Sequence, residues 1–198
     1  MNKATELKDW QINNGFTKPK KNLKIYYSPL AVTKTVMLVN THPEEIGWNM
    51  VVKPYKDGYK VEDIFVYPQK VSPAYVSVDL PRYGLWKAAL DENIEANLFG
   101  NGHSHVNMST FASIVDINQQ HDEILTKKNG FYLFQIWNKR NEINSFFYDI
   151  DNKIFYESED IDIIVEEADE FITESFRITQ GERKWADNFE IYEAGEDF

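Results

Sequence analysis

The sequence predicts an α/β (α+β) fold in which a mixed β-sheet is flanked by helices. Short apolar or alternating segments between turn residues predict strands, and stretches with apolar residues at three- and four-residue spacing predict helices. The 198 residues are 42% hydrophobic and 15% aromatic, which is enough for one well-filled core. We therefore expect an N-terminal arm over 1–30, a core over 31–157, and an acidic C-terminal helix and tail over 158–198 that packs on the core or on a partner.

The expected arm is rich in lysine. Residues 1–24 hold six lysines among few apolar groups, with Gly15 and Pro19 as breakers. A lysine cluster can bind nucleic acid. Because the remainder of the chain is acidic, we interpret this one as a solvated segment.

The strands are assigned from short apolar segments bounded by turn residues. Residues 35–39 form an apolar, β-branched run that is typical of a buried strand. Residues 56–58, Lys-Asp-Gly, form a hairpin turn between strands at 46–52 and 59–67. Residues 71–79 contain a proline and form an edge strand or a loop. Three further strands are expected at 131–137, 143–150 and 154–156.

Helices are assigned from helical spacing and capping residues. Residues 82–97 have the apolar spacing of an amphipathic helix with one core face. Another helix begins after Ser109 or Thr110, either of which is a good N-cap. Residues 161–176 carry an apolar stripe among acidic side chains and predict a third helix. Residues 181–198 are acidic with Trp185, Phe189, Ile191 and Tyr192 interspersed, and we interpret them as a strand that folds back rather than a binding tail.

Composition excludes several classes of function. A net charge of -11 repels nucleic acid and anionic membranes, so we expect neither as a partner, whereas a basic patch on a protein would be attracted. The chain has no cysteine, so any zinc must be held by histidine and carboxylate. Residues 1–6 lack the apolar run of a signal peptide, and no stretch approaches the roughly 20 apolar residues of a membrane span. We expect a cytoplasmic protein and leave its oligomeric state open.

The stretch 102–116 carries a candidate metal site. His103 and His105 lie one residue apart, and such positions share a face of a strand, so both imidazoles could bind one ion. If the chain turns back as a helix after His105, Asp116 completes a three-ligand set. One coordination position then remains open, as in catalytic zinc sites.

Ser113 and Glu44 are candidates for catalysis beside these ligands. Ser113 lies three residues before Asp116, so on a helix its hydroxyl would lie beside the metal and could donate to an oxyanion. Glu44 lies where a strand begins and could be the general base. Each residue alone could be a helix cap or a surface carboxylate, but those roles leave the spacing of all five residues unexplained.

The order Glu-x-x-Gly, His-Ser-His, seven residues and Ser-x-x-Asp resembles the JAMM motif of the JAB/MPN metallopeptidases. Five residues match its positions: Glu44, by its spacing to Gly47, and then His103, His105, Ser113 and Asp116. The resemblance implies that the histidines and the aspartate bind Zn2+, that the glutamate acts as acid and base on the zinc water, and that the serine helps hold the tetrahedral intermediate. It also implies an MPN/JAB-like sheet with cytidine-deaminase-like layering.

The same resemblance implies a deubiquitinase-like isopeptidase. Its substrate would be the amide bond that joins the C-terminus of ubiquitin or a ubiquitin-like protein to a lysine or a short extension. One departure is visible, because many members carry proline directly after the second histidine, whereas this chain has Val106. We expect the loop after His105 to take a different path, which concerns substrate fit more than metal binding.

Other interpretations keep the residues but change the function. A catalytically silent MPN-type scaffold usually loses motif residues, whereas this chain keeps all five. The same hydrolase could instead act on a non-ubiquitin protein of bacterial or phage origin. Metallo-β-lactamases need Asp-His soon after the second histidine, where residues 106–109 are Val-Asn-Met-Ser, and amidohydrolase barrels need about 250 residues. His42 and His121 are expected at the surface or beside the site, with only His42 near Glu44.

Overall fold

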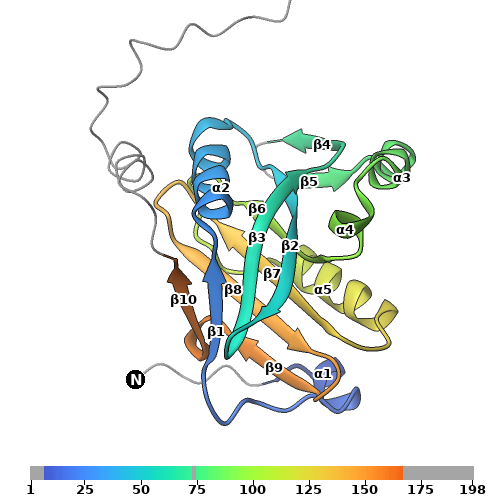
Figure 1. The fold of residues 1–198 in the computed structure, drawn as a ribbon, viewed down its shortest axis with the longest axis vertical. Helices are drawn as coiled ribbons and strands as arrows, with labels where there is room; N and C mark the ends of the chain where they lie inside the picture. Colours follow the sequence, from blue (N-terminus) through green and yellow to red (C-terminus); the bar gives the residue numbers. More distant parts are fainter. Residues whose placement is uncertain (1–6, 73–74, 167–198) are drawn as a thin grey trace, which may run out of the picture.

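Eight strands form one mixed, nearly closed β-sheet (Figure 1). This computed structural model describes residues 7–72 and 75–166. The strand order is β10-β1-β3-β2-β6-β7-β8-β9, with parallel pairing for β10–β1, β1–β3 and β6–β7 and antiparallel pairing elsewhere. The strands are β1 Leu23–Tyr27, β2 Gly47–Tyr55, β3 Gly58–Val66, β6 Leu98–Ser104, β7 Phe131–Trp137, β8 Ile143–Asp149, β9 Ile154–Glu157 and β10 Ile161–Val165.

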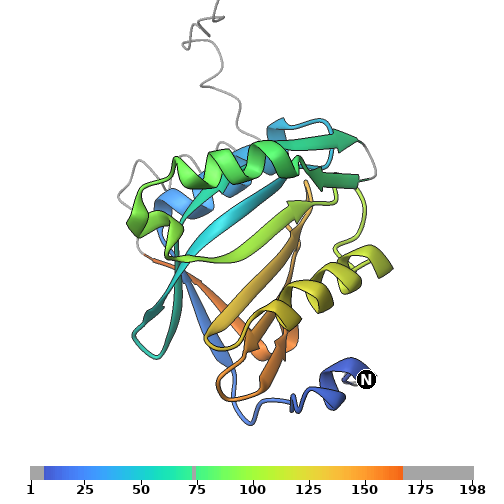
Figure 2. The same ribbon diagram turned by 90° about the vertical axis from the view of Figure 1, so that its right-hand side faces the viewer.

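Helices and a separate hairpin flank this sheet. They are α1 Asp9–Asn13, α2 Pro29–Thr41, α3 Leu80–Ala88, α4 Glu92–Glu95, α5 Ile114–Thr126, the 3-10 helix η1 Ser158–Asp160, and the antiparallel pair β4 Gln69–Ser72 and β5 Tyr75–Val78. Figure 2 shows the end of β6 between the β4–β5 hairpin and α5. None of the helices in the described ranges is long and apolar enough to cross a membrane.

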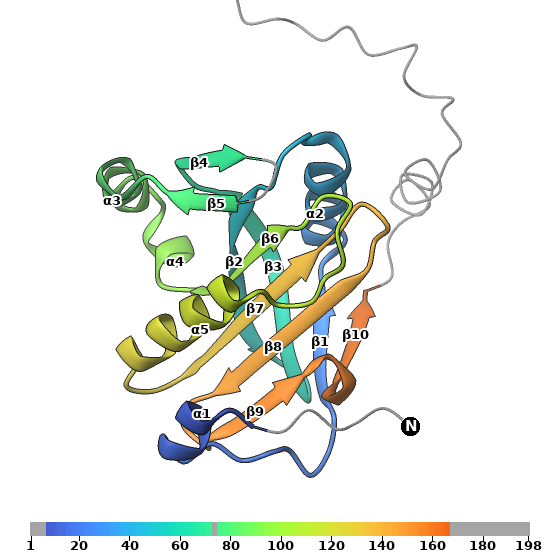
Figure 3. The same cartoon turned by 180° about the vertical axis from the view of Figure 1, so that it is seen from behind.

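Two hydrophobic clusters occupy the two faces of the sheet. In the larger one, Trp48 and Met50 of β2 are fully buried and belong to the same cluster as Val36 of α2. On the other face, Tyr148 of β8 and Ile124 of α5 belong to a second cluster. Helices α5 and α1 lie over this second face in Figure 3. Helix α5 is thereby attached to the sheet close to the end of β6.

The expected strand at 35–39 is wrong, because these residues belong to helix α2. Ser28 is the N-cap, its Oγ accepts from the amide of Ala31 at 3.0 Å, and Pro29 starts the helix with a suitable fixed φ. The buried residues of α2 share one face: Ala31, Val32, Thr35, Val36 and Val39. Capping and tertiary burial therefore outweigh the β-branched preference of the run.

The expected helix at 82–97 is two helices, and its core face is wrong. Asp91 caps α4 by accepting from the amide of Asn93 at 2.9 Å, so the chain stops and restarts at this point. Neither α3 nor α4 has a buried residue, and Leu85 is 75% exposed. The apolar spacing therefore reflects a helix that stands away from the core.

The sheet extends beyond the expected core at both ends. Strand β1 lies within the expected arm and pairs with β3 and β10, and α1 is docked because Gln11 Nε2 donates to Tyr148 Oη at 3.1 Å. The helix expected from 161 is wrong over 161–165, where pairing with β1 makes β10 a strand. Residues 167–176 of that expected helix and the expected strand at 181–198 lie outside the described residues. The expected strands at 46–52, 59–67, 131–137, 143–150 and 154–156 are confirmed by β2, β3, β7, β8 and β9.

Candidate metal centre

Strand β6 brings both histidines to one side of the sheet. Gly47 of β2 lies opposite His103, and the amide of His105 donates to the carbonyl of Trp137 at 2.7 Å, which extends the pairing past the end of β6. The imidazole centroids are 4.9 Å apart. Gly102, the residue before His103 on the core side of β6, has no room for a side chain, since a Cβ there would lie 2.6 Å from the Trp48 indole.

Helix α5 supplies the carboxylate. Its N-cap is Ser113, four residues after the earlier of the two expected caps, Ser109 and Thr110. The Ser113 amide and hydroxyl each donate to Asp116 Oδ2 at 2.6 Å, and the Asp116 amide donates back to Ser113 Oγ at 3.2 Å. This reciprocal capping box fixes the direction of the carboxylate.

The loop between the histidines and α5 is held by the β7–β8 hairpin and its turn. Three side chains donate to loop carbonyls at 3.0 Å each: Asn138 to Met108, Arg140 to Asn107, and Asn144 to Thr110. Val106 has φ +47, a left-handed conformation that is rare for a β-branched residue and that proline cannot adopt. The loop therefore follows a backbone path that would not be possible with proline at position 106. The late start of α5 follows, because residues 107–110 are bound to the hairpin.

The three expected metal ligands converge. His103 Nε2 lies 3.1 Å from Asp116 Oδ1, and His105 Nε2 lies 3.6 Å from Asp116 Oδ2. All three donor atoms lie within 4.8 Å of one another. Their side chains are 13%, 9% and 10% exposed, in the order His103, His105 and Asp116, so the cluster is mostly shielded from solvent without being sealed.

The electrostatics of this cluster favour a cation. Burial alone would raise the pKa of the Asp116 carboxyl, but hydrogen bonds from the two histidines hold that pKa well below its ordinary value of 3.8. Burial lowers the pKa of the His105 imidazole, yet its hydrogen bonds to Asp116 and to the Ser109 carbonyl, together with the negative charges of Asp116 and Glu45, outweigh burial and leave the pKa raised above 6.5. Asp116 is therefore a carboxylate at neutral pH, facing two imidazole nitrogens.

The donor set fits a divalent metal ion. His105 Nδ1 lies 2.8 Å from the carbonyl of Ser109, and in the neutral imidazole donation to that carbonyl leaves the Nε2 lone pair available to a metal ion. Ser113 orients the carboxylate in the same way, and such outer partners are typical of metal sites. His103, His105 and Asp116 could thus hold a metal ion. Two imidazoles and one carboxylate occur both in zinc hydrolases and in non-haem iron sites.

The glutamate beside this cluster is Glu45, not Glu44. Glu45 is 4% exposed, lines the cavity that contains both histidines, and has its pKa raised by burial, with the histidine charges acting in the opposite direction. Glu44 is half-buried and does not line that cavity. Its amide donates to His42 Nδ1 at 3.3 Å, which forms a local turn before β2.

Strand register explains this correction. The amide of Ser104 donates to the carbonyl of Ile46 at 2.9 Å, so Glu45 comes opposite His105 in the antiparallel pair. Because side chains alternate, Glu45 shares the face of the histidines and Glu44 points the other way. The sequence carried a signal for this: alternate apolar residues, Ile46, Trp48, Met50 and Val52, mark the core face and leave Glu45 on the opposite one.

A cavity of about 380 Å³ opens above the cluster. Glu45, the two histidines and Asp116 form its polar side. Among its other lining residues, Met108, Phe111 and Val115 are 48%, 80% and 68% exposed, so its rim is apolar. His42 lies beside Glu44 away from this cavity, and His121 lies farther along α5 with its ring edge against Trp10.

Comparisons with known proteins leave the site to be interpreted from its geometry. No family model and no curated protein sequence matches the chain. Among solved structures, protein DSY2949 from Desulfitobacterium hafniense is similar, with a TM-score of 0.48 and 18% identity over 74% of this chain and 96% of that chain. A likeness of this size supports no inference about function.

Proposed function

We propose that the chain is a zinc-dependent metallopeptidase of the JAMM type, a JAB/MPN-like hydrolase that cleaves an amide bond. The observation that carries this proposal is the meeting of His103, His105 and Asp116 with the buried carboxyl of Glu45 in one open cavity. A three-ligand set with a carboxylic base beside it suits hydrolysis better than electron transfer, since hydrolysis needs a group that moves protons. The order of the motif residues along the chain supports the same family.

The proposed mechanism assigns a task to each residue. His103, His105 and Asp116 would hold zinc, which when bound polarises a carbonyl and makes water acidic at neutral pH. Glu45 removes the proton from the attacking water and delivers it to the leaving nitrogen. Burial raises its pKa above the ordinary value of 4.5, which makes this carboxylate a stronger base than an exposed glutamate.

Ser113 acts through Asp116 in the ground state. Its hydroxyl donates to Asp116 Oδ2, so that proton is already engaged in orienting the ligand. Donation to an oxyanion, the role that the family resemblance implies, requires the hydroxyl to rotate away from the carboxylate. We propose the positioning role as the main one.

The substrate we propose is the C-terminus of ubiquitin or a ubiquitin-like protein, joined through an amide bond to lysine or to a short extension. An extended C-terminal tail suits an open cavity with an apolar rim better than a folded surface does. A cytoplasmic location is consistent with a chain that has no cysteine.

Cleavage of defined fusions tests this function. Zinc-loaded full chain is incubated with ubiquitin-like proteins that carry a short C-terminal extension, and products are weighed by mass spectrometry. We expect release of the extension by the wild type and none by Glu45→Gln. Metal binding without cleavage of any fusion, or of casein as an unrelated polypeptide, would contradict a peptidase. Absence of metal uptake would favour a scaffold.

A further inference from the structure

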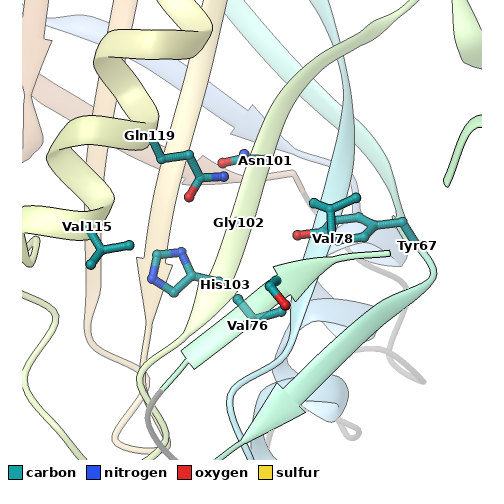
Figure 4. Close-up of a pocket in the computed structure, with 9 residues that line it drawn as sticks. Tyr67, Val76, Val78, Asn101, Gly102, His103, Val115 and Gln119 are labelled. Carbon is teal, nitrogen blue, oxygen red and sulfur yellow. The ribbon is translucent and has the colours of Figure 1, made fainter. Parts of the chain in front are cut away.

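A second cavity of about 260 Å³ adjoins the metal cluster between α5, β6 and strand β5 (Figure 4). Four residues line both this cavity and the larger one, so the two are continuous around the His103 imidazole: Val76, His103, Val115 and Gln119. Its volume is below the roughly 300–1,000 Å³ of pockets that hold small-molecule ligands. A space of this size, open to a reacting centre, suits one amino-acid side chain.

Apart from the Ser77 hydroxyl, the walls of this cavity are apolar. Val76 and Val78 come from β5, and Val115 comes from α5 on the opposite side (Figure 4). Tyr67 lies behind Val78, and a Cβ on Gly47 would overlap the Tyr67 hydroxyl, so the glycine leaves room for this ring. The burial of Tyr67 raises its pKa to about 12, so its hydroxyl keeps its proton at neutral pH.

Two amides supply polar groups inside these walls. Asn101 extends from β6, two residues before His103, and Gln119 extends from α5 toward His103 (Figure 4). Each amide has a donor and an acceptor, which can pair with another amide or with a hydroxyl. No hydrogen bond joins either amide to another described side chain or backbone group, so both remain available to a ligand.

The residues that line this cavity in the described part of the chain include no carboxylate, lysine or arginine. Apart from His103, none of the lining residues is ionisable at neutral pH, and the carboxyl of Glu45 lines the other cavity. A lysine or arginine side chain would find no carboxylate among these lining residues, and an acidic side chain would find no lysine or arginine among them. An apolar side chain would remove water from both amides without replacing its hydrogen bonds, which is unfavourable.

We propose that this cavity, hereafter the amide pocket, selects an uncharged hydrogen-bonding side chain on the substrate residue beside the cleaved bond. Glutamine fits it best, because a carboxamide offers a donor and an acceptor together. Gln119 and Asn101 are the specificity-determining residues. The role of the pocket in substrate selection rests on the proposed function, whereas binding to the pocket can be measured without turnover.

Binding of small probes tests the amide pocket. The full-length, zinc-loaded chain, and separately the metal-free chain, is titrated with the N-acetyl N-methylamides of glutamine, glutamate, lysine and norleucine. The side-chain amide signals of Asn101 and Gln119 are followed by NMR. We expect the glutamine probe to shift both signals and to bind about fivefold more tightly than the others, as the loss of one neutral hydrogen bond predicts. Equal affinities, or no shift of either signal, would overturn the proposal.

Charge substitution makes the test sharper. Gln119 is exposed on α5, so Gln119→Lys should fold as the wild type does, and we expect it to reverse the preference from the glutamine to the glutamate probe. Asn118→Leu is the matched control, because Asn118 is an exposed neighbour that does not line the pocket. A Gln119→Lys variant that binds all four probes as the wild type does would remove Gln119 from the pocket.

The same variants separate pocket from function. If the wild type cleaves fusions, Gln119→Lys should raise the relative kcat/KM for a fusion with glutamate beside the cleaved bond over one with glutamine. Probe binding without any cleavage would leave the pocket in place and reject the peptidase. Cleavage of fusions, with no preference among the probes or among the fusions, would support the peptidase and reject the amide pocket.

Discussion

The strand-borne and helix-borne halves of the site are held in different ways. His103, His105 and Glu45 lie along paired strands whose core side is filled by fully buried Trp48 and Met50. Asp116 instead follows a loop whose carbonyls are held by hydrogen bonds from polar side chains of the β7–β8 hairpin. Main-chain pairing over a packed core fixes the first half, whereas a few polar contacts fix the second.

This difference teaches where the site can be adjusted. A shift of strand register by one residue turns a side chain to the other face of the sheet. A change in the strand-borne half therefore either keeps a ligand or loses it completely. The capped helix can shift by small amounts as its loop changes, so the second half tunes metal affinity. We therefore expect all-or-none effects from the strands and graded effects from the helix.

The largest expected effect comes from His105→Ala. Removing one of three ligands should abolish metal binding, so zinc content measured by atomic emission should fall from one ion per chain to none. His121→Ala is the matched control and should keep its zinc, because His121 lies on α5 outside the cluster. Zinc at full occupancy in His105→Ala would break the assignment of the strand-borne half.

Glu45→Gln should retain zinc and lose turnover by roughly 10²–10⁴-fold, the usual contribution of a general base. Glu44→Gln is the matched control and should cleave like the wild type, because Glu44 does not line the cavity. Rates are measured with whichever ubiquitin-like fusion the wild type cleaves. A reversed result would mean that the register of β2 differs from the one described.

Ser113→Ala tests the helix-borne half. The variant loses the hydrogen bond that the hydroxyl donates to the Asp116 carboxylate and the one that it accepts from the Asp116 amide, which should weaken zinc affinity about 10–100-fold without abolishing it. Ser109→Ala should have little effect, since only the backbone carbonyl of Ser109 contacts His105. Competition with a chelator measures both. Unchanged zinc affinity with slower turnover would assign Ser113 to the oxyanion instead.

Zinc affinity and fold stability should both depend on pH, because His105 of the strand-borne half contacts Asp116 of the helix-borne half. The pKa of His105 is raised above 6.5, and zinc needs the neutral imidazole, so zinc affinity should rise about tenfold per pH unit below that pKa and level off above it. In the metal-free chain, the contribution of His105 to fold stability changes with pH in the opposite direction. Its charged imidazole stabilises the fold below pH 6.5, and this contribution is lost as pH rises through the raised pKa. His105→Gln should remove the second dependence in thermal unfolding.

Val106→Gly should have the smallest effect. Glycine adopts a φ of +47 freely, so relief of strain should stabilise the fold by about 1 kcal/mol or less and leave zinc affinity unchanged. Chemical denaturation measures the difference. A loss of stability would show that packing of the valine side chain outweighs its strain, and that the loop is held more by apolar contacts than by hydrogen bonds.

The sequence predicted the parts of the site that depend on local spacing. His103 and His105 follow from strand alternation, and Ser113 and Asp116 follow from helical spacing, so their meeting could be anticipated. The choice between Glu44 and Glu45 could not be made from a glycine three residues away, because it depends on how β2 pairs with β6. Alternation of Ile46 and Trp48 held that information, since both are core residues.

Predictions of the fold failed where tertiary contacts override local preference. The β-branched run in α2 became helical because Ser28 caps it and one face is buried. Strand β10 formed because β1 offers an edge more than a hundred residues away in the chain, which no window of sequence reveals. The fold as a mixed sheet with flanking helices was predicted correctly.

Anomalous diffraction at the zinc edge, on crystals of the full chain prepared with zinc, tests the central claim most directly. We expect one peak at about 2.0–2.2 Å from His103 Nε2, His105 Nε2 and one oxygen of Asp116, with the carboxyl of Glu45 facing the same space. A peak elsewhere would contradict a metal site at this cluster. So would the absence of any peak from crystals kept in a zinc-saturated solution.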